Sequence, residues 1–220
     1  MVVAVNFTMS ETMTWPTKLP LIAILRGIRP DEVLEHVGAL IDAGFDAIEV
    51  PLNSPDWQQS IRLAVAEYGS RALIGAGTVL QADDVDVLAA LGGRLLVSPN
   101  TDADVIRRAV GHQLVTCIGC MTATEAFVAL RAGAQTLKFF PAGELGPNYL
   151  KAVLTVVPKS VPVFAVGGVT PENLGHFLSV GCACAGLGSD LYRAGQPLER
   201  TRERARAFVD AYRHYQESTR

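Results

Sequence analysis

The sequence has few of the features that mark membrane, nucleic-acid-binding or secreted proteins. No apolar run approaches the ~18 residues of a membrane span, and the first ten residues lack the basic segment and extended apolar stretch of a signal peptide. The 19 Lys and Arg residues are scattered among 22 Asp and Glu residues, giving a net charge of −3. Because no basic block could neutralise a phosphate backbone, we expect a cytoplasmic protein without a nucleic-acid or membrane partner.

Cysteine is also scarce, and its pattern argues against a metal centre. The four cysteines form one C-x-x-C pair, Cys117 and Cys120, and one C-x-C pair, Cys182 and Cys184. Both pairs lie in apolar segments, and no histidine follows at zinc-finger spacing. We therefore predict reduced, largely buried thiols, with a metal or redox site as the alternative.

The four histidines give no sign of a metal or acid–base centre either. They fall in expected helices or at helix ends, away from the ends of the expected strands, at His36, His112, His176 and His214. No cluster of His, Asp and Glu accompanies them, so we predict neither a catalytic metal nor a cofactor.

Hydrophobic residues, in contrast, are abundant at 49% of the chain, enough to build a large single core. Eight short apolar runs recur, and their continuous Val, Ile and Leu content is typical of parallel strands covered by helices. The expected strands are Leu21–Leu25, Ala47–Pro51, Ala72–Ala76, Leu95–Ser98, Leu114–Cys117, Thr136–Phe140, Val161–Val166 and Ala183–Leu187.

Helix-start signals separate these runs at regular intervals. They include Pro30-Asp31-Glu32, Ser54-Pro55, the capping-box spacing of Thr122 and Glu125, and Thr170-Pro171-Glu172. Strand starts lie roughly 19 to 26 residues apart, near the minimum for a strand with a crossover helix. Eight such units in 220 residues favour an α/β fold, a single (β/α)8 TIM barrel, over an open doubly wound sheet.

Both ends of the chain are expected to be helical. We predict a leading helix around Ser10–Trp15 within an N-terminal segment of residues 1–18, followed by the barrel over residues 19–220. The charged tail Glu199–Tyr215 reads as a final helix.

Lysine is rare, and one of the four lysines occupies an unusual place. Lys138 interrupts the apolar strand 136–140, whereas Lys18, Lys151 and Lys159 do not lie in strands. With a side-chain period of two, Leu137 and Phe139 face the helices and Lys138 points into the barrel. Burial there lowers the lysine pKa and keeps part of it as the neutral amine that attacks a carbonyl carbon. A buried ion pair without catalytic work is the alternative.

Glu49 occupies the equivalent inward position on the second strand, between Ile48 and Val50 and near the carboxyl end, where barrel enzymes place their chemistry. A carboxyl group in such a low-dielectric site has a raised pKa and can shuttle protons near neutrality. It could instead be a structural partner of Lys138 or Arg26.

Two further polar residues follow the first and third expected strands. Arg26 closes the first strand, and Thr78 follows Gly75-Ala76-Gly77 after the third. A guanidinium grips a carboxylate with two hydrogen bonds and a hydroxyl adds a third, so the pair suits a 2-oxo acid. Thr78 alone could equally be a turn or cap residue.

Small residues follow the last two strands, with two glycines at Gly167-Gly168 and a glycine and a serine at Gly188-Ser189. Barrels frequently bind phosphate in the loops after strands seven and eight, where glycine lets backbone N–H groups approach closely. Gly167-Gly168 alone would be an ordinary turn, but glycine-containing dipeptides in both loops predict a phosphate site.

With these residues, the chain resembles the class I 2-keto-3-deoxy-6-phospho-sugar-acid aldolases. The resemblance extends from about Leu19 to Tyr212. The matching stretches are LPLIAILRGI, DAGFDAIEVPLNSP, ALIGAGTV, SPN, ATEA, GAQTLKFFPA, FAVGGVTPENL and AGLGSDLYRAG.

The resemblance implies a role for each candidate residue. Lys138 would form a Schiff base and Glu49 would donate and accept protons. Arg26 and Thr78 would contact the keto-acid end of a phosphorylated keto-sugar acid. The phosphate would lie against Gly168, Gly188 and Ser189, with Gly167 adjacent. The resemblance also implies a homotrimer.

Two positions depart from the gluconate-specific members of this family. Those members have an arginine four residues after the glutamate and a threonine before the paired glycines, whereas this chain has Asn53 and Val166. The departure favours the galactonate epimer and places Val166 against the substrate. The alternatives are the gluconate epimer or both epimers, a non-covalent phosphosugar isomerase or epimerase, and a non-catalytic phosphate-ligand binding protein.

Overall fold

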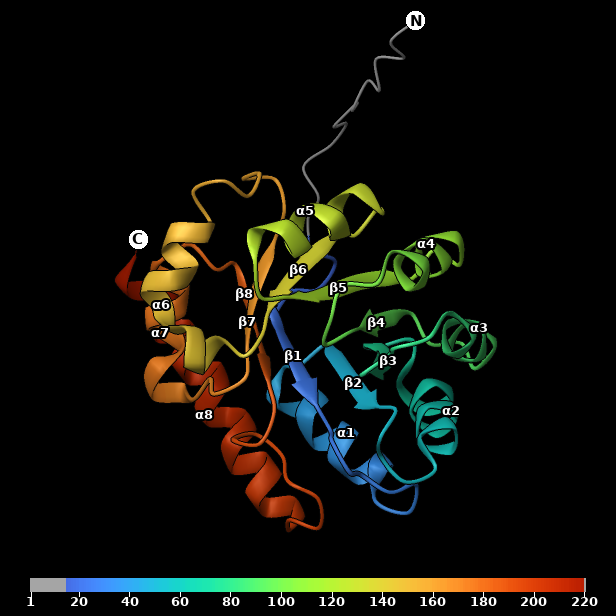
Figure 1. Ribbon diagram of the computed structural model, residues 1–220. Helices are drawn as coiled ribbons and strands as arrows, with labels where there is room; N and C mark the ends of the chain where they lie inside the picture. Colours follow the sequence, from blue (N-terminus) through green and yellow to red (C-terminus); the bar gives the residue numbers. More distant parts are fainter. Residues whose placement is uncertain (1–14, 220) are drawn as a thin grey trace, which may run out of the picture.

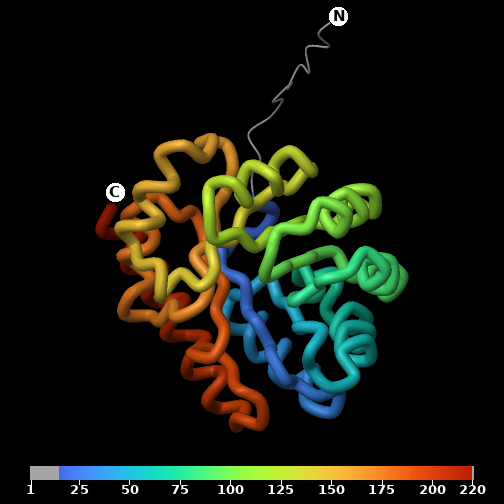
Figure 2. Tube along the Cα trace, in the orientation of Figure 1, coloured from blue at the N-terminus to red at the C-terminus, as the bar shows by residue number. Residues whose placement is uncertain are grey.

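The computed structural model describes residues 15–219 and contains eight parallel strands that close into a barrel in chain order. Helices alternate with the strands and surround them (Figure 1), and the chain travels once around the barrel (Figure 2). The strands are β1 (Leu21–Ile24), β2 (Ala47–Pro51), β3 (Leu73–Gly77), β4 (Leu95–Val97), β5 (Val115–Cys120), β6 (Thr136–Phe139), β7 (Val163–Val166) and β8 (Cys184–Leu187). The helices are α1 (Val33–Ala43), α2 (Trp57–Tyr68), α3 (Ala82–Ala90), α4 (Ala103–Gly111), α5 (Ala123–Arg131), α6 (Ala142–Val153), α7 (Pro171–Ser179) and α8 (Leu198–Ser218).

This architecture confirms the predicted (β/α)8 barrel, and each expected strand has its counterpart. Most boundaries shift by one or two residues, but β5 continues three residues beyond the predicted end at Cys117, through Gly119 to Cys120. Gly119 lies within this strand and passes closely by the backbone of Pro99. A Cβ on Gly119 would lie only 2.2 Å from the carbonyl carbon of Pro99. Glycine in this strand therefore marks a close backbone approach and not a turn.

Side chains alternate between two apolar layers, as the period of a strand requires. Outward-facing residues such as Ile48, Val50, Leu137 and Phe139 belong to the core between the sheet and the helices. A smaller cluster fills the barrel interior and consists of Ile22, Ile24, Ala47, Leu73, Leu95, Val97, Cys117, Phe164, Val166 and Cys184. Because of this alternation, the two polar residues predicted to face inward share the interior with a few apolar side chains.

The segment before β1 packs against the amino-terminal end of the barrel. Most of the leading helix predicted around Ser10–Trp15 lies outside the described residues, and Trp15 itself is not helical. The indole of Trp15 contacts Phe164 edge-on, with ring centroids 4.6 Å apart, and packs against the interior cluster together with Val115. It thereby covers the end of the barrel opposite the strand carboxyl ends.

Two predicted helix starts have the expected capping geometry. Thr122 accepts a hydrogen bond from the backbone N–H of Glu125, whose carboxylate accepts one in return, and Thr170 forms the same box with Asn173 ahead of α7. The predicted tail helix is α8, which packs between α1 and α7. No helix among the described residues is long and apolar enough to cross a membrane.

Candidate active site

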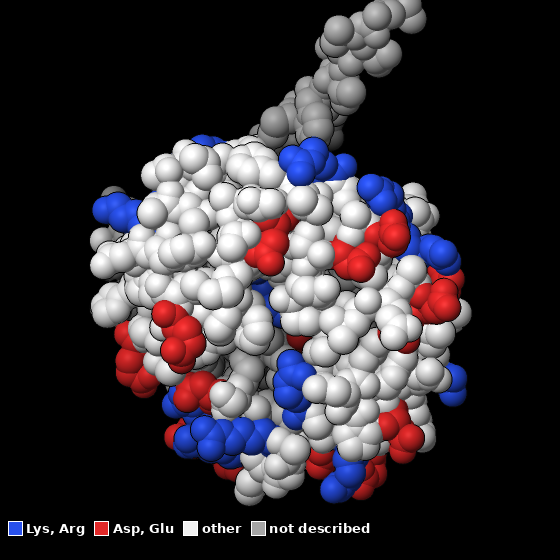
Figure 3. All heavy atoms as spheres, in the orientation of Figure 1, with Lys and Arg blue, Asp and Glu red and all other residues white. Residues whose placement is uncertain are grey.

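A cavity of about 660 Å³ opens at the carboxyl end of the strands. In the orientation of Figure 1, the surface is hollowed near its middle, with Lys or Arg atoms in and beside the hollow (Figure 3). Every predicted substrate-binding residue lines the cavity, namely Arg26, Thr78, Lys138, Val166, Gly167, Gly168, Gly188 and Ser189. Glu49 is the one predicted site residue that does not line it, since its side chain is buried in the barrel interior.

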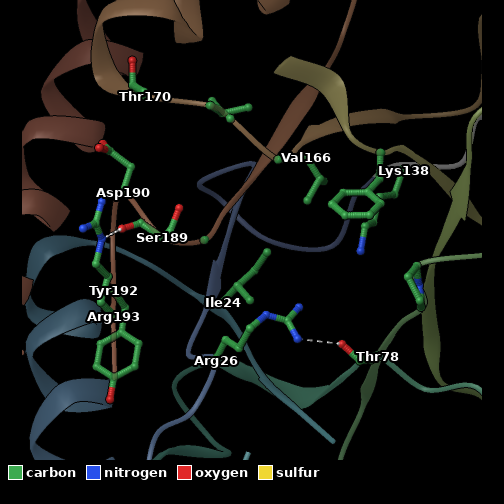
Figure 4. Close-up of a pocket in the computed structure, with 16 residues that line it drawn as sticks. Ile24, Arg26, Thr78, Lys138, Val166, Thr170, Ser189, Asp190, Tyr192 and Arg193 are labelled. Atoms are coloured by element: carbon green, nitrogen blue, oxygen red, sulfur yellow. Dashed lines mark hydrogen bonds between the residues drawn. The ribbon is translucent and has the colours of Figure 1, made fainter. Parts of the chain in front are cut away.

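Lys138 projects from the middle of β6 into the cavity (Figure 4) and is only 5% exposed. Burial lowers the pKa of its ammonium group, while the nearby Glu49 carboxyl opposes that shift. Its Nζ lies 5.1 Å from the ring centroid of Phe140, which also lines the cavity. The amine is therefore desolvated yet accessible from the cavity, which is the requirement for a nucleophilic lysine.

Glu49 lies on β2 and is 2% exposed. Its desolvation raises the pKa to about 7, and the charges of Lys138 and Arg26 partly counter the rise. Among the described residues, its Oε2 is buried without a hydrogen-bond partner. A carboxyl group with such a pKa exists in both protonation states near neutrality, so it can take up a proton and return it.

Arg26 and Thr78 meet across the rim of the cavity. Arg26 Nη1 donates to Asn53 Oδ1 at 2.7 Å and to Thr78 Oγ1 at 3.4 Å, and the second bond is drawn in Figure 4. Thr78 has a φ of 57°, a left-handed conformation that β-branched residues rarely adopt. Such strain is common at functional sites. Thr78 is the first residue after β3, at the turn where the chain leaves the barrel.

The two glycine-containing loops form the opposite part of the cavity. Gly167 and Gly168 have φ values of 89° and 72°, and the Gly143 N–H donates to the Gly167 carbonyl at 2.8 Å. A Cβ on Gly168 would lie 3.1 Å from the Cα of Gly143 in the first turn of α6, so the close approach of the β7–α7 loop to α6 depends on glycine. The nearby α7 begins at Pro171, and its amino terminus favours an anion.

Sequence reasoning missed several residues that line the cavity: Ile24, Pro99, Phe140, Val169, Thr170, Asp190, Tyr192 and Arg193. Most follow a predicted site residue by one to five positions or lie at a strand end, and this proximity in sequence is the signal that could have identified them. Their approach to the cavity depends on loop conformation, which strand periodicity does not specify.

The remaining sequence predictions concern metals and thiols. All four cysteines are free and buried, as predicted, and none of the four histidines lines the cavity. His36 is bonded to Thr201 instead, at 2.8 Å, and His112 to Asp86 at 2.7 Å. Within residues 15–219, no three His, Cys, Asp or Glu side chains gather as a metal site would require.

Comparison with known proteins connects this geometry to one family. The chain is 65% identical over 201 residues to 2-dehydro-3-deoxy-6-phosphogalactonate aldolase of Escherichia coli K12, covering 91% of this chain and 98% of that relative. The solved native KDPGal structure superposes with a TM-score of 0.92 at 63% identity, covering 93% of this chain and 99% of the other.

A designed, cube-shaped protein cage built by fusing symmetric oligomeric domains also matches, with a TM-score of 0.92 and 64% identity over 92% of this chain and 75% of the cage chain. The model of the KDPG and KHG aldolase family matches residues 13–202. The protein belongs to the KDPG and KHG aldolase family.

Proposed function

We propose that the protein is a class I aldolase that cleaves 2-dehydro-3-deoxy-6-phospho-D-galactonate to pyruvate and D-glyceraldehyde 3-phosphate. The observation that carries the proposal is the buried lysine of β6, open to the cavity, with a carboxyl group of raised pKa beside it. A non-covalent isomerase or a binding protein has no need for a desolvated amine at this place. Membership of the family and the similarity to the Escherichia coli enzyme support the same reaction.

The first stage joins the substrate to Lys138. The neutral amine attacks the C2 carbonyl carbon, and loss of water gives a protonated imine. Arg26 and Thr78 hold the C1 carboxylate at one side of the cavity, and the loops after β7 and β8 hold the phosphate at the other. Fixing both ends places C2 against the amine and C3–C4 within reach of the base.

The second stage breaks the carbon–carbon bond. Glu49, acting through a water because its carboxylate is buried, accepts the proton of the C4 hydroxyl. The C3–C4 electron pair moves into the imine to form an enamine, and the aldehyde leaves as D-glyceraldehyde 3-phosphate. The same carboxyl group then returns the proton to C3 of the enamine. Hydrolysis of the resulting imine frees pyruvate and restores the amine, so neither a metal nor a cofactor takes part.

Two residues support the galactonate epimer over the gluconate epimer. Val166, the last residue of β7, presents an apolar side chain to the cavity, and Asn53 binds Arg26 instead of supplying a cation itself. Both positions are occupied differently in gluconate-specific members, as the resemblance implies. The identity of 65% to a relative named 2-dehydro-3-deoxy-6-phosphogalactonate aldolase agrees with this assignment.

We also propose a homotrimer in the cytoplasm. Three large apolar side chains are exposed after strands on the carboxyl side of the barrel: Leu80 at 49%, Met121 at 49% and Phe140 at 39%. Exposed apolar groups of this size on one side of a protein favour burial against another copy. Four free cysteines are consistent with a reducing compartment. Solution scattering tests the assembly, because a trimer has three times the 23.5 kDa mass of one chain.

Borohydride trapping tests the proposed chemistry. The protein is incubated with pyruvate and reduced, and the intact mass and modified peptide are read by mass spectrometry. We expect one pyruvyl adduct on Lys138 that is absent from Lys138→Arg. Lys151→Arg, a change of the same kind at an exposed lysine on α6, should keep the adduct. An adduct on Lys18, Lys151 or Lys159 alone, or none, would favour a non-covalent isomerase.

A further inference from the structure

The loop between β8 and α8 carries a basic side chain that the proposed mechanism does not use. Arg193 lines the cavity, and its Nε donates to the carbonyl of Ser189 at 2.9 Å (Figure 4). Ser189 is itself one of the phosphate-loop residues. The guanidinium is therefore attached to the loop in which the phosphate is expected.

The backbone beneath Arg193 is fixed by polar contacts that reach into the protein. The Arg193 N–H donates to Gln196 Oε1 at 3.0 Å, and Gln196 Nε2 donates to Thr201 Oγ1 at 2.7 Å. Thr201 is fully buried and hydrogen-bonds to His36 Nδ1, so the chain of contacts ends in the packing of α1 against α8. The position of Arg193 is thus set before any ligand arrives, which lowers the entropic cost of using it.

Tyr192 secures the same loop from the other side. Its ring is buried edge-on against His36, with centroids 5.1 Å apart, and its hydroxyl donates to Glu32 Oε1 at 3.0 Å. Because Tyr192 is held in the core, the backbone that carries Arg193 is fixed in position.

The charges around this loop leave the end of Arg193 available. Asp190, the acidic residue of the cavity wall, forms a salt bridge with Arg204 of α8. Within the described part of the chain, the terminal nitrogens of Arg193 have neither a hydrogen bond nor a salt bridge. Arg26 and Lys138, the other cations of the cavity, lie across the cavity from it (Figure 4).

A phosphate monoester carries about −1.5 to −2 charges at neutral pH, and a guanidinium can add charge-assisted, bidentate hydrogen bonds to those that backbone N–H groups donate. We infer that Arg193 binds the substrate phosphate through its terminal nitrogens and makes the site selective for phosphorylated over unphosphorylated substrates. The inference rests on the proposed aldolase function and adds a specificity residue to it. Ser189 and the glycine loops shape the phosphate site, and Arg193 supplies the compensating charge.

The test compares two aldehyde acceptors in the synthetic direction, each with saturating pyruvate. D-glyceraldehyde 3-phosphate carries the phosphate, and D-glyceraldehyde does not. For Arg193→Gln we expect the KM for the phosphorylated aldehyde to rise roughly 10- to 100-fold, the loss expected for a charge-assisted hydrogen bond, with little change for the unphosphorylated one. Arg193→Lys, which keeps the charge but not the planar fork, should fall between the two.

Arg202→Gln is the matched control, because Arg202 is an exposed arginine on α8 that pairs with Glu199 and does not line the cavity. It should leave both KM values unchanged. Inorganic phosphate provides a second readout: it should inhibit the reaction with the phosphorylated aldehyde competitively in the wild type and much more weakly in Arg193→Gln.

The possible outcomes separate the two proposals. If Arg193→Gln leaves the KM for the phosphorylated aldehyde unchanged, or weakens both acceptors equally, Arg193 only holds the loop and the inference is wrong. If the wild-type protein condenses neither aldehyde with pyruvate, the aldolase function itself fails and takes the inference with it.

Discussion

The Cα of Gly77 lies directly against the carboxylate of Glu49. A Cβ built on Gly77 would be 2.0 Å from Glu49 Oε2 and 2.3 Å from Oε1, closer than any real contact allows. The glutamate on β2 and the glycine at the end of neighbouring β3 therefore fit only because position 77 has no side chain. This relationship fixes where the buried carboxyl group can be.

We predict that Gly77→Ala displaces Glu49 and impairs the proton-transfer steps more than imine formation. A shift of about 1 Å in a catalytic group can cost ~100-fold in rate, so kcat for cleavage should fall by about that factor. Exchange of the pyruvate C3 protons, followed by NMR in deuterated water, should fall in parallel, whereas borohydride trapping on Lys138 should persist. Gly111→Ala is the control, because its Cβ would meet nothing within 4 Å. Equal, unimpaired exchange in both variants would contradict the positioning role of Gly77.

The pKa of Glu49 predicts a pH dependence with a definite sign. Desolvation raises this pKa to about 7, and the base that removes the C4 hydroxyl proton must be ionised. Cleavage should therefore slow as the pH falls through about 7 and level off above it. A pH profile of kcat for pyruvate release measures this limb. In Glu49→Gln, kcat should drop and its fall towards acid pH should disappear. If that fall persists in the variant with the same midpoint, the titrating group is not Glu49.

The contact between Asn53 and Arg26 predicts graded effects on binding of the keto acid. Arg26→Gln removes the guanidinium and should raise the apparent pyruvate constant for Schiff-base formation roughly 10- to 100-fold. Asn53→Ala only frees the guanidinium to move, so its effect should be smaller, and kcat should change less than KM in both. The apparent pyruvate constant is obtained from the borohydride-trapping yield as a function of pyruvate concentration, and kcat and KM from the rate of pyruvate release. Should Asn53→Ala be as damaging as Arg26→Gln, Asn53 would contact the substrate itself.

The strand period was sufficient to predict the barrel and the inward orientation of its polar residues. Lys138 stands between Leu137 and Phe139, and this alternation alone separates the cavity from the helix-facing core. The loops were less predictable. Whether Arg193 reaches the cavity depends on Gln196 and a buried Thr201 on another element, and no local pattern encodes such contacts. Gly119, which lies beyond the predicted strand end at Cys117, is part of β5 and passes closely by the backbone of Pro99, a tertiary contact that strand periodicity does not specify.

Val166 gives the sharpest prediction about stereochemistry. Its side chain lines the cavity at the end of β7, packed so closely on β8 that a Cβ at Gly186 would lie 2.8 Å from Val166 Cγ2. Val166→Thr keeps the shape of the side chain but replaces one methyl group with a hydroxyl, at a position where gluconate-specific members are expected to have threonine. Because a hydrogen-bonding group distinguishes hydroxyl epimers better than an apolar one, the ratio of kcat/KM for the gluconate to the galactonate substrate should rise about 10-fold.

Pyruvate release from each epimer, measured separately with coupled reduction, gives this ratio. Val156→Thr makes the same substitution at a side chain that is 55% exposed and outside the cavity, and should leave the ratio unchanged. If Val166→Thr slows both epimers alike, the valine serves packing alone, and the stereochemical choice must be sought at Arg26 and Asn53. If the ratio rises while the pyruvate adduct on Lys138 forms as in the wild type, the hydroxyl acts on the C4 end of the substrate and not on imine formation.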